Sequence, residues 1–200
     1  EGVTLGRRHD PMGSSFYNCP VNGKDVELPI KDFIIGGAAG TGNGWRMLMD
    51  CLSAGRAVTL PASSTGVAKL CYYAIGAYAK VRKQFGISIG RFDGVQEPMS
   101  RIGGYTYLLE AARVYTCGSV DSGEKPSVVS AIAKYHFTEI GRKIINDAMD
   151  ISGGSGISRG PHNIFANHYI STPIGITVEG ANILTRTMIV FGQGLIRCHP

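Results

Sequence analysis

Apolar side chains recur at every third or fourth position over most of the chain after residue 44, which is the period of a helix with one buried face. Before residue 44 the pattern differs, because short runs alternate polar and apolar residues as half-exposed strands do. The change falls at a glycine-rich linker over residues 36–44. The helical period predicts helices over about 47–85, 94–119, 128–148, 163–169 and 183–196, with a loop over 171–177.

The three longest predicted helices are joined by short turns, which favours an antiparallel bundle. Pro61 falls inside the first of them and is expected to kink it or to interrupt it briefly. His136 lies on the apolar stripe of the third, so we interpret it as a core histidine rather than a ligand. The expected fold class is mainly α, with the end of a β domain followed by an antiparallel helical bundle.

The first 37 residues have the texture of strands and turns, with short extended runs at 2–5 and 24–30. Two or three strands do not form a stable sheet alone. We therefore interpret residues 1–37 as the C-terminal part of a middle β domain and residues 38–200 as a helical bundle domain. The chain begins at Glu1 rather than Met and stops soon after an apolar helix, so we expect a fragment of a longer chain.

Composition and charge exclude several classes of function. The net charge of +5 is carried by scattered residues, whereas nucleic-acid binders cluster basic residues on one face, so no nucleic-acid partner is expected. The sequence holds no apolar run of about 20 residues that could span a membrane. The five cysteines are widely spaced and form no CxxC pair, which predicts reduced core thiols and no metal site. Reduced thiols favour a cytoplasmic location, with any association with the inner membrane resting on parts outside these 200 residues.

One carboxylate is a candidate for chemistry. Glu179 lies between the apolar runs 174–178 and 183–190, on a turn that leads into the last predicted helix. Beside so much apolar surface the carboxylate is expected to lose water, which would strengthen it as a base. Gly180 would let the backbone approach a ligand closely. The alternative, from spacing alone, is that Glu179 only interacts with the dipole of a helix N-terminus.

Two other features could contact an anion. The run of glycines at 153–156 could present free backbone N–H groups to a phosphate, or it could be a flexible turn between helices. Because it follows a predicted helix rather than a strand, neither a Rossmann turn nor a P-loop fits. Arg82, near a predicted helix end, could pair with a phosphate or with the helix dipole.

Three stretches occur in the order seen in one family, and together they are far more specific than any one of them. Residues 78–86 resemble the YAxxRxxFG signature of flavin-dependent acyl-CoA dehydrogenases. Residues 150–156 resemble the QxxGGxG turn of that family, with Asp150 where Gln is usual. Residues 178–181 resemble its YEGT signature, in which the Glu is the catalytic base. The chain thus resembles the C-terminal half of an acyl-CoA dehydrogenase.

The resemblance covers essentially the whole chain. The loop at 7–13 and the strand ending at Ile30 resemble the end of the family's β domain. Within the family, the runs 178–186 and 191–194 are similar to the large bacterial acyl-CoA dehydrogenases of fatty-acid β-oxidation. This similarity implies FAD-dependent oxidation of a fatty acyl-CoA to the trans-2-enoyl-CoA.

In that reaction Glu179 would remove the α-proton while the β-hydrogen leaves as hydride to the flavin. The backbone N–H of Glu179 would stabilise the thioester oxygen as it gains negative charge. Some relatives carry the base on the first long helix, immediately before an arginine, and here that position is Gly55, ahead of Arg56. Glu179 is therefore the implied catalytic residue, and Arg56, Glu179 and Gly180 are the implied substrate-binding residues.

For FAD, the resemblance implies that Arg82 contacts the pyrophosphate and that the glycine turn approaches the FAD of a neighbouring subunit. Asp93 and Asp150 stand where the family commonly has Gln, and Ala181 stands where it has Thr. The two carboxylates would repel a pyrophosphate unless they are paired. The implied cofactor-binding residues are Arg82, Phe85, Gly153, Gly154, Gly180 and Ala181.

The implied partners are an acyl-CoA substrate, an electron-transfer flavoprotein as electron acceptor, and a second copy of the chain in a homo-oligomer formed through the helical bundle. The competing hypothesis is a non-catalytic helical module that keeps the family's shape for oligomerisation or interaction. The family's N-terminal helical domain and most of its β domain would lie outside these 200 residues. We therefore expect this piece alone to bind FAD weakly or not at all and to be inactive.

Overall fold

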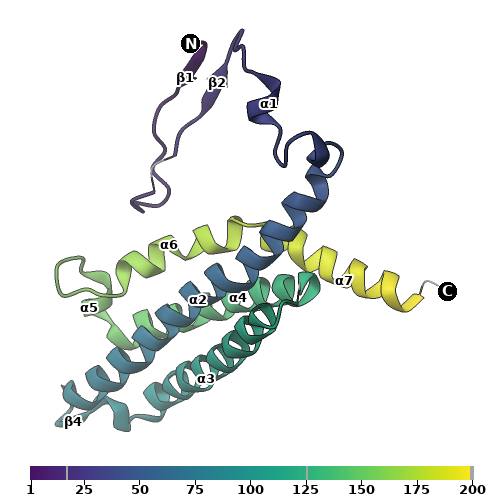
Figure 1. Cartoon of the computed structure of the whole chain (residues 1–200). Coiled ribbons are helices and arrows are strands. Elements are labelled where there is room, and N and C mark those ends of the chain that lie inside the picture. The colour runs from purple at the N-terminus through teal and green to yellow at the C-terminus, as the bar shows by residue number, and fades with distance from the viewer. Residues whose placement is uncertain (17, 125, 199–200) are drawn as a thin grey trace.

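Three long helices form the body of the molecule (Figure 1). The computed structural model describes residues 1–16, 18–124 and 126–198. Helix α2 spans Gly44–Val81, α3 spans Asp93–Asp121 and α4 spans Ser127–Ser152, and each packs against the other two. Their connections are short, so consecutive helices run antiparallel. This arrangement confirms the predicted, mainly helical fold class.

Shorter elements flank the three long helices. Helix α7 extends away from the bundle at the right of Figure 1, and the C-terminus lies at its far end. The short elements are β1 (Val3–Leu5), β2 (Val21–Gly23), α1 (Ile30–Phe33), the 3-10 turns η1 (Ala38–Gly40) and η2 (Ile89–Arg91), β3 (Lys83–Gln84), β4 (Ile87–Ser88), α5 (Gly154–Ile157), α6 (Ala166–Thr177) and α7 (Asn182–Cys198).

Helix α4 is central, because it contacts α2, α3, α6 and α7. The long helices were predicted from apolar residues that recur every three or four positions. Residues at this spacing lie on one face of a helix, and in each long helix that face is buried in the core. The core cluster includes Ala68, Cys71 and Ile75 of α2, Ile102 and Leu109 of α3, and Ala133, Phe137, Ile144, Ile145 and Ala148 of α4.

Ion pairs tie α3 to both of its neighbours. Arg101 of α3 binds Asp147 of α4 with two parallel bonds, from Nη2 to Oδ1 at 2.7 Å and from Nε to Oδ2 at 3.1 Å. Glu110 of α3 binds Lys69 of α2 at 3.0 Å and Arg113 at 2.8 Å. Hydrogen bonds from Arg113 and Lys69 lower the pKa of Glu110 to about 2.

The N-terminal segment stands apart from the bundle (Figure 1). Strands β1 and β2 pair antiparallel, with Val3 opposite Gly23, and their residues are exposed. The strand predicted over residues 24–30 is absent from this described segment, because the chain turns at Asp25, whose φ is 50°. Pro29 then precedes the helical turn α1 and has no N–H to offer a strand ladder.

The predicted loop over 171–177 is wrong, since these residues form the second half of α6. Their serine and threonine side chains suggested a loop, but their hydroxyls bond within the helix. Thr172 Oγ1 donates to the His168 carbonyl at 2.8 Å, and Thr177 Oγ1 donates to the Pro173 carbonyl at 2.9 Å. Helix α2 likewise continues through Pro61 without interruption.

Two predictions about single core residues need correction. His136 is exposed, with its ring edge-on to Tyr135 at a centroid distance of 5.0 Å, because Ala133 and Phe137 occupy the buried face of α4 instead. Among the cysteines, only Cys71 of the described side chains is fully buried. Cys51 is exposed, Cys19 and Cys117 are half-buried, and the side chain of Cys198 lies outside the described residues.

No helix within residues 1–16, 18–124 and 126–198 has both the length and the continuous apolar character required to cross a membrane.

Candidate active site

The turn between α6 and α7 carries the predicted base. Helix α6 ends at Thr177 and α7 begins at Asn182, so residues 178–181 form the turn. Glu179 has a φ of 55° and Gly180 a φ of 90°, both in the left-handed region. Glycine adopts this region freely, whereas a residue with a Cβ is destabilised there by about 1–2 kcal/mol. Contacts outside the turn must therefore hold it in this shape.

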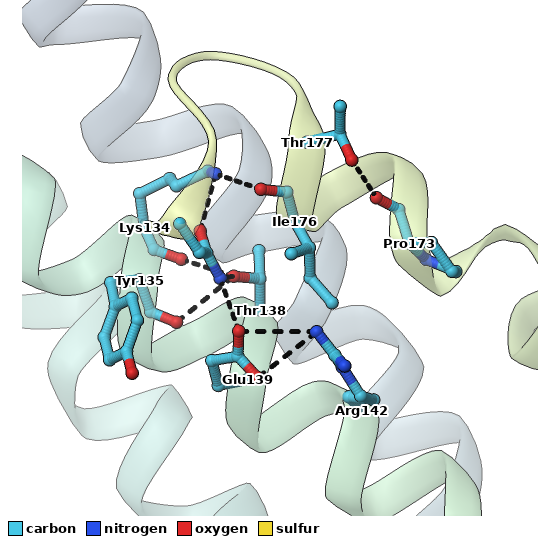
Figure 2. Close-up of polar contacts among 9 residues, drawn as sticks. Lys134, Tyr135, Thr138, Glu139, Arg142, Pro173, Ile176 and Thr177 are labelled. Carbon is cyan, nitrogen blue, oxygen red and sulfur yellow. Dashed lines mark hydrogen bonds and ion pairs between the residues drawn. The ribbon is translucent and has the colours of Figure 1, made fainter. Parts of the chain in front are cut away.

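Those contacts converge on Lys134 of α4, whose side chain has no exposed surface. Its Nζ donates to the Ile176 carbonyl at 3.1 Å, to the Gly180 carbonyl at 2.7 Å and to Asn182 Oδ1 at 2.7 Å. Figure 2 shows the Lys134 side chain reaching across to Ile176. Three acceptors use all three N–H groups of an ammonium. Burial lowers the pKa of Lys134, and the negative charge of Glu179 opposes that shift.

Asn182, the first residue of α7, is also buried and completes the attachment. Its Nδ2 donates to Thr138 Oγ1 and to Glu139 Oε1, both at 2.9 Å. Glu139 in turn pairs with Arg142 at 3.4 Å, as Figure 2 shows. A connected set of hydrogen bonds therefore fixes both ends of the turn to α4.

The Glu179 carboxylate faces helix α2. Thr59 Oγ1 lies 3.1 Å from Glu179 Oε1 and donates to it, and the same hydroxyl lies 2.9 Å from the Gly55 carbonyl. Arg56 is close as well, because a Cβ added to Gly180 would lie 3.7 Å from its Nη1. The structure thus brings Glu179, Gly180 and Arg56 together, beside the helix position occupied by Gly55.

Glu179 is exposed, which contradicts the expectation that its apolar neighbours would exclude water from it. Val178 and Ile183 are themselves 41% and 80% exposed, so they do not cover the carboxylate. Among the described residues the carboxylate is a fixed group that is open to an incoming ligand.

Arg56 carries an unsatisfied donor close to the Glu179 turn. Its Nε is buried and has no hydrogen-bond partner within the described part of the chain. A buried donor without an acceptor costs about 1–3 kcal/mol. An acceptor atom of a bound molecule would remove this cost.

A second group of predicted residues lies at the far end of α2. Tyr78 joins that end to the glycine turn, because its hydroxyl donates to the Ser152 carbonyl at 3.3 Å and lies 3.4 Å from Ser155 Oγ. Gly153 has a φ of 54°, and a Cβ on Gly153 or Gly154 would meet nothing within 4 Å. The turn is therefore sterically open, but the expectation of free backbone N–H groups is wrong for Gly153, whose N–H donates to the Met149 carbonyl at 3.0 Å and to the Asp150 carbonyl at 3.2 Å.

Arg82 and Phe85 lie just beyond the same end of α2, and both are exposed. Phe85 has a φ of 53° and 86% of its surface is exposed, with its ring edge-on to Phe92. A free guanidinium, an open aromatic face and an accessible glycine backbone fit the phosphate and ring parts of a dinucleotide. Asp93 and Asp150 are exposed near the same elements.

The two groups of residues are far apart. The part of α2 that runs from Arg56 to its C-terminal end is roughly 40 Å long, from the rise of an α-helix. Glu179, Gly180, Ala181 and Arg56 therefore form one site, whereas the Arg82, Phe85 and glycine-turn residues form another. One chain presents two separate regions rather than a single pocket.

One groove among the described residues belongs to neither region. It has a volume of about 570 Å³ and lies between α2, α4 and α6. Leu60, Ser63, Thr138, His168 and Ile174 are among its lining residues, and none of the predicted site residues lines it.

Lys134, Asn182 and Thr59 were not predicted as site residues. Lys134 had a signal in the sequence, since it lies three and four positions before Phe137 and Thr138, on the buried face of α4. A lysine is rarely fully buried unless its charge is paired. Its partners, however, are backbone carbonyls more than 40 residues away, and no sequence pattern reveals these.

Comparison with known proteins defines the class. The family profile of the acyl-CoA dehydrogenase C-terminal domain matches residues 42–192. The chain belongs to the acyl-CoA dehydrogenase family and carries its C-terminal domain. The resemblance seen in the sequence is confirmed at this level.

The relatives are diverse. The mitochondrial short/branched chain specific acyl-CoA dehydrogenase of Bos taurus is 28% identical over 193 residues, which are 94% of this chain and 42% of that protein. Protein HemX of Proteus mirabilis is 54% identical over 77 residues, which are 38% of this chain and 45% of that protein. The matched relatives therefore do not single out the large bacterial acyl-CoA dehydrogenases of β-oxidation, to which the sequence motifs were compared.

Solved structures share the fold. A glutaryl-coenzyme A dehydrogenase in complex with glutaryl-CoA has a TM-score of 0.84 and 26% identity, covering 98% of this chain and 48% of that one. PigA with FAD and proline has a TM-score of 0.81 and 21% identity, and the match covers 98% of this chain and 49% of that one. Homologues in this family therefore bind FAD. This chain spans less than half the length of each of these relatives and structures.

Proposed function

We propose that this chain supplies the catalytic base of an FAD-dependent dehydrogenase that converts a fatty acyl-CoA to the trans-2-enoyl-CoA in fatty-acid β-oxidation. The observation that carries the proposal is the Glu179 turn. An exposed carboxylate sits in a strained backbone conformation, which a buried lysine and asparagine hold in place. A left-handed residue often follows the C-terminus of a helix, but that residue is usually glycine, so a glutamate held there is unusual for a turn that only connects two helices.

Glu179 takes the α-proton of the acyl-CoA, and its carboxylate becomes a carboxylic acid. FAD, when bound, would supply the two-electron acceptor that the β-hydrogen needs as it leaves as hydride. The Glu179 N–H makes no backbone hydrogen bond within the described residues, so it is available to the thioester oxygen as that oxygen gains charge. Arg56, whose Nε also has no partner among these residues, lines the substrate side of the site in this proposal.

We also propose the residues that contact FAD. Arg82 would hold the pyrophosphate through its guanidinium, and Phe85 would lie beside the dinucleotide. Gly153 and Gly154 approach the same FAD through their exposed backbone. The distance of roughly 40 Å along α2 supports the view that this FAD belongs to a neighbouring subunit. Gly180 and Ala181 lie near the flavin of the chain's own site.

Three further proposals concern the protein as a whole. Residues 1–37 end a middle β domain, and residues 38–200 form the helical domain through which a homo-oligomer assembles. An electron-transfer flavoprotein reoxidises the reduced FAD. The enzyme acts in the cytoplasm.

The test is the bleaching of bound FAD by acyl-CoA in the full-length protein. Glu179→Gln should bind FAD in the same amount and lower the rate of bleaching by several orders of magnitude, on the order of the effect of losing a general base. Glu124→Gln, an equivalent change at an exposed glutamate away from the site, should bleach at the original rate. Unchanged bleaching by the Glu179 variant would refute the assignment of the base.

A further inference from the structure

The turn that holds Glu179 depends on one residue that does not reach the substrate side. Lys134 is fully buried in α4, and its Nζ bonds the carbonyl three residues before Glu179 and the carbonyl immediately after it. These two carbonyls, of Ile176 and Gly180, belong to the last turn of α6 and to the turn itself. The ammonium therefore binds backbone carbonyls on both sides of Glu179 in the sequence and makes no hydrogen bond to the Glu179 carboxylate among the described residues.

The backbone at Glu179 is in a conformation that would relax if this attachment were lost. A φ of 55° is unfavourable for a residue with a Cβ, and surrounding contacts must impose it. Glu179 itself has only one described side-chain hydrogen bond, from Thr59. The remaining constraint comes from the Gly180 carbonyl, which Lys134 holds at 2.7 Å and Thr185 Oγ1 at 3.1 Å.

A lysine is an unusual choice for a purely structural role at this position. Burying an ammonium costs free energy unless every N–H is satisfied, and an apolar residue would fill the same space without that cost. Here all three N–H groups are used, and two of the three acceptors lie on the segment that carries the base. The negative charge of Glu179 also favours the ammonium form of Lys134.

We infer that Lys134 is the positioning residue for the catalytic base. Its ammonium fixes the backbone of residues 176–182, so that the Glu179 carboxylate and N–H are presented in one geometry. Asn182 assists, because it binds the same ammonium and secures it to Thr138 and Glu139. The inference rests on the proposed function, since it assigns a role relative to Glu179.

The experiment compares variants of the FAD-loaded full-length protein. Lys134→Met should keep FAD bound, change KM for acyl-CoA by less than about threefold, and lower kcat about 100-fold, the effect expected when a reacting group moves by about 1 Å. Lys143→Met, the same change at an exposed lysine of α4, should leave both constants unchanged. A normal kcat in Lys134→Met would overturn the inference.

A double variant separates positioning from general damage. If Lys134 acts through Glu179, then adding Lys134→Met to Glu179→Gln should lower the residual rate by less than about threefold, since the base is already absent. A further loss of about 100-fold would show that Lys134 supports the site in another way and would overturn the inference.

Two outcomes keep the proposals distinguishable. If Lys134→Met fails to bind FAD, Asn182→Ala replaces it. This change removes the hydrogen bonds of Asn182 to Lys134, Thr138 and Glu139, so kcat should fall at least about tenfold, with the same absence of further loss in the Glu179→Gln background. A normal kcat in Asn182→Ala would then overturn the inference. Full activity of Glu179→Gln would instead remove the proposed function itself.

Discussion

The Thr59 hydroxyl donates a hydrogen bond of 3.1 Å to the Glu179 carboxylate and so joins α2 to the turn between α6 and α7, across 120 positions of sequence. The same hydroxyl is within 2.9 Å of the Gly55 carbonyl, its partner one helical turn earlier. Thr59 of α2 therefore orients the side chain of the proposed base, and Lys134 of α4 fixes the backbone next to it.

Thr59→Val should lower kcat by about threefold to tenfold, because one hydrogen bond to the carboxylate, worth on the order of 1 kcal/mol, is lost. Steady-state kinetics of the full-length protein measures this. Thr187→Val removes a comparable hydroxyl, which bonds the Ile183 carbonyl within α7, and should leave kcat unchanged. Equal effects of the two substitutions would contradict a role for Thr59 at the base.

Gly180→Ala should reduce both stability and activity. A Cβ at a φ of 90° is strained, by about 1–2 kcal/mol, and it would lie 3.3 Å from Thr185 Oγ1. Relief of that strain would move the Glu179 turn, so kcat should fall at least about tenfold. Gly118→Ala, in an open position of α3, should instead stabilise the fold by up to about 1 kcal/mol. Denaturant unfolding and kinetics of both variants give the comparison, and normal activity of Gly180→Ala would count against the account.

The buried thiol of Cys71 predicts a pH dependence of stability. Burial raises the pKa of Cys71 from 9.0 to about 12, so the folded state retains the proton at a pH where the unfolded state has lost it. The stability contributed by the protonated thiol is complete below pH 9 and is lost as the pH rises toward 12. Urea unfolding from pH 8 to pH 11 should show a steeper loss for the original chain than for Cys71→Ala. Identical slopes would show that the thiol does not titrate in this way.

The 200-residue chain alone should not retain FAD. Arg82 and the glycine turn lie roughly 40 Å along α2 from the Glu179 site, so one chain contacts a given dinucleotide only in part. After addition of FAD and passage through a desalting column, the absorption spectrum should show no stoichiometric flavin band. A retained band would mean that these residues form a complete dinucleotide site by themselves.

The fold was largely predictable, because the apolar residues that recur every three or four positions both indicate a helix and form the face that packs into the core of the bundle. Ile102 and Leu109 of α3 lie seven positions apart, at that spacing, and both are buried. The boundaries of α6 were predicted wrongly. Serine and threonine are common in loops, but here the hydroxyls of Ser171 and Thr172 donate to the His168 carbonyl within the helix.

The candidate site was predictable only in part. The motif led to the proposal of Glu179, but the exposure of its carboxylate could not be predicted, because neighbours in the sequence such as Ile183 are themselves exposed and do not cover it. Lys134 is the clearest omission. Its role depends on carbonyl groups of α6 and the following turn, and backbone atoms carry no sequence signature.

The measurement that tests the central claim most directly is exchange of the substrate α-hydrogen with solvent deuterium. The full-length protein with FAD is incubated with acyl-CoA in D₂O, and α-deuterium is measured by mass spectrometry in the recovered substrate. The account predicts exchange with the original protein and, within detection, none with Glu179→Gln. Exchange at the original rate in that variant would show that another group removes the α-proton.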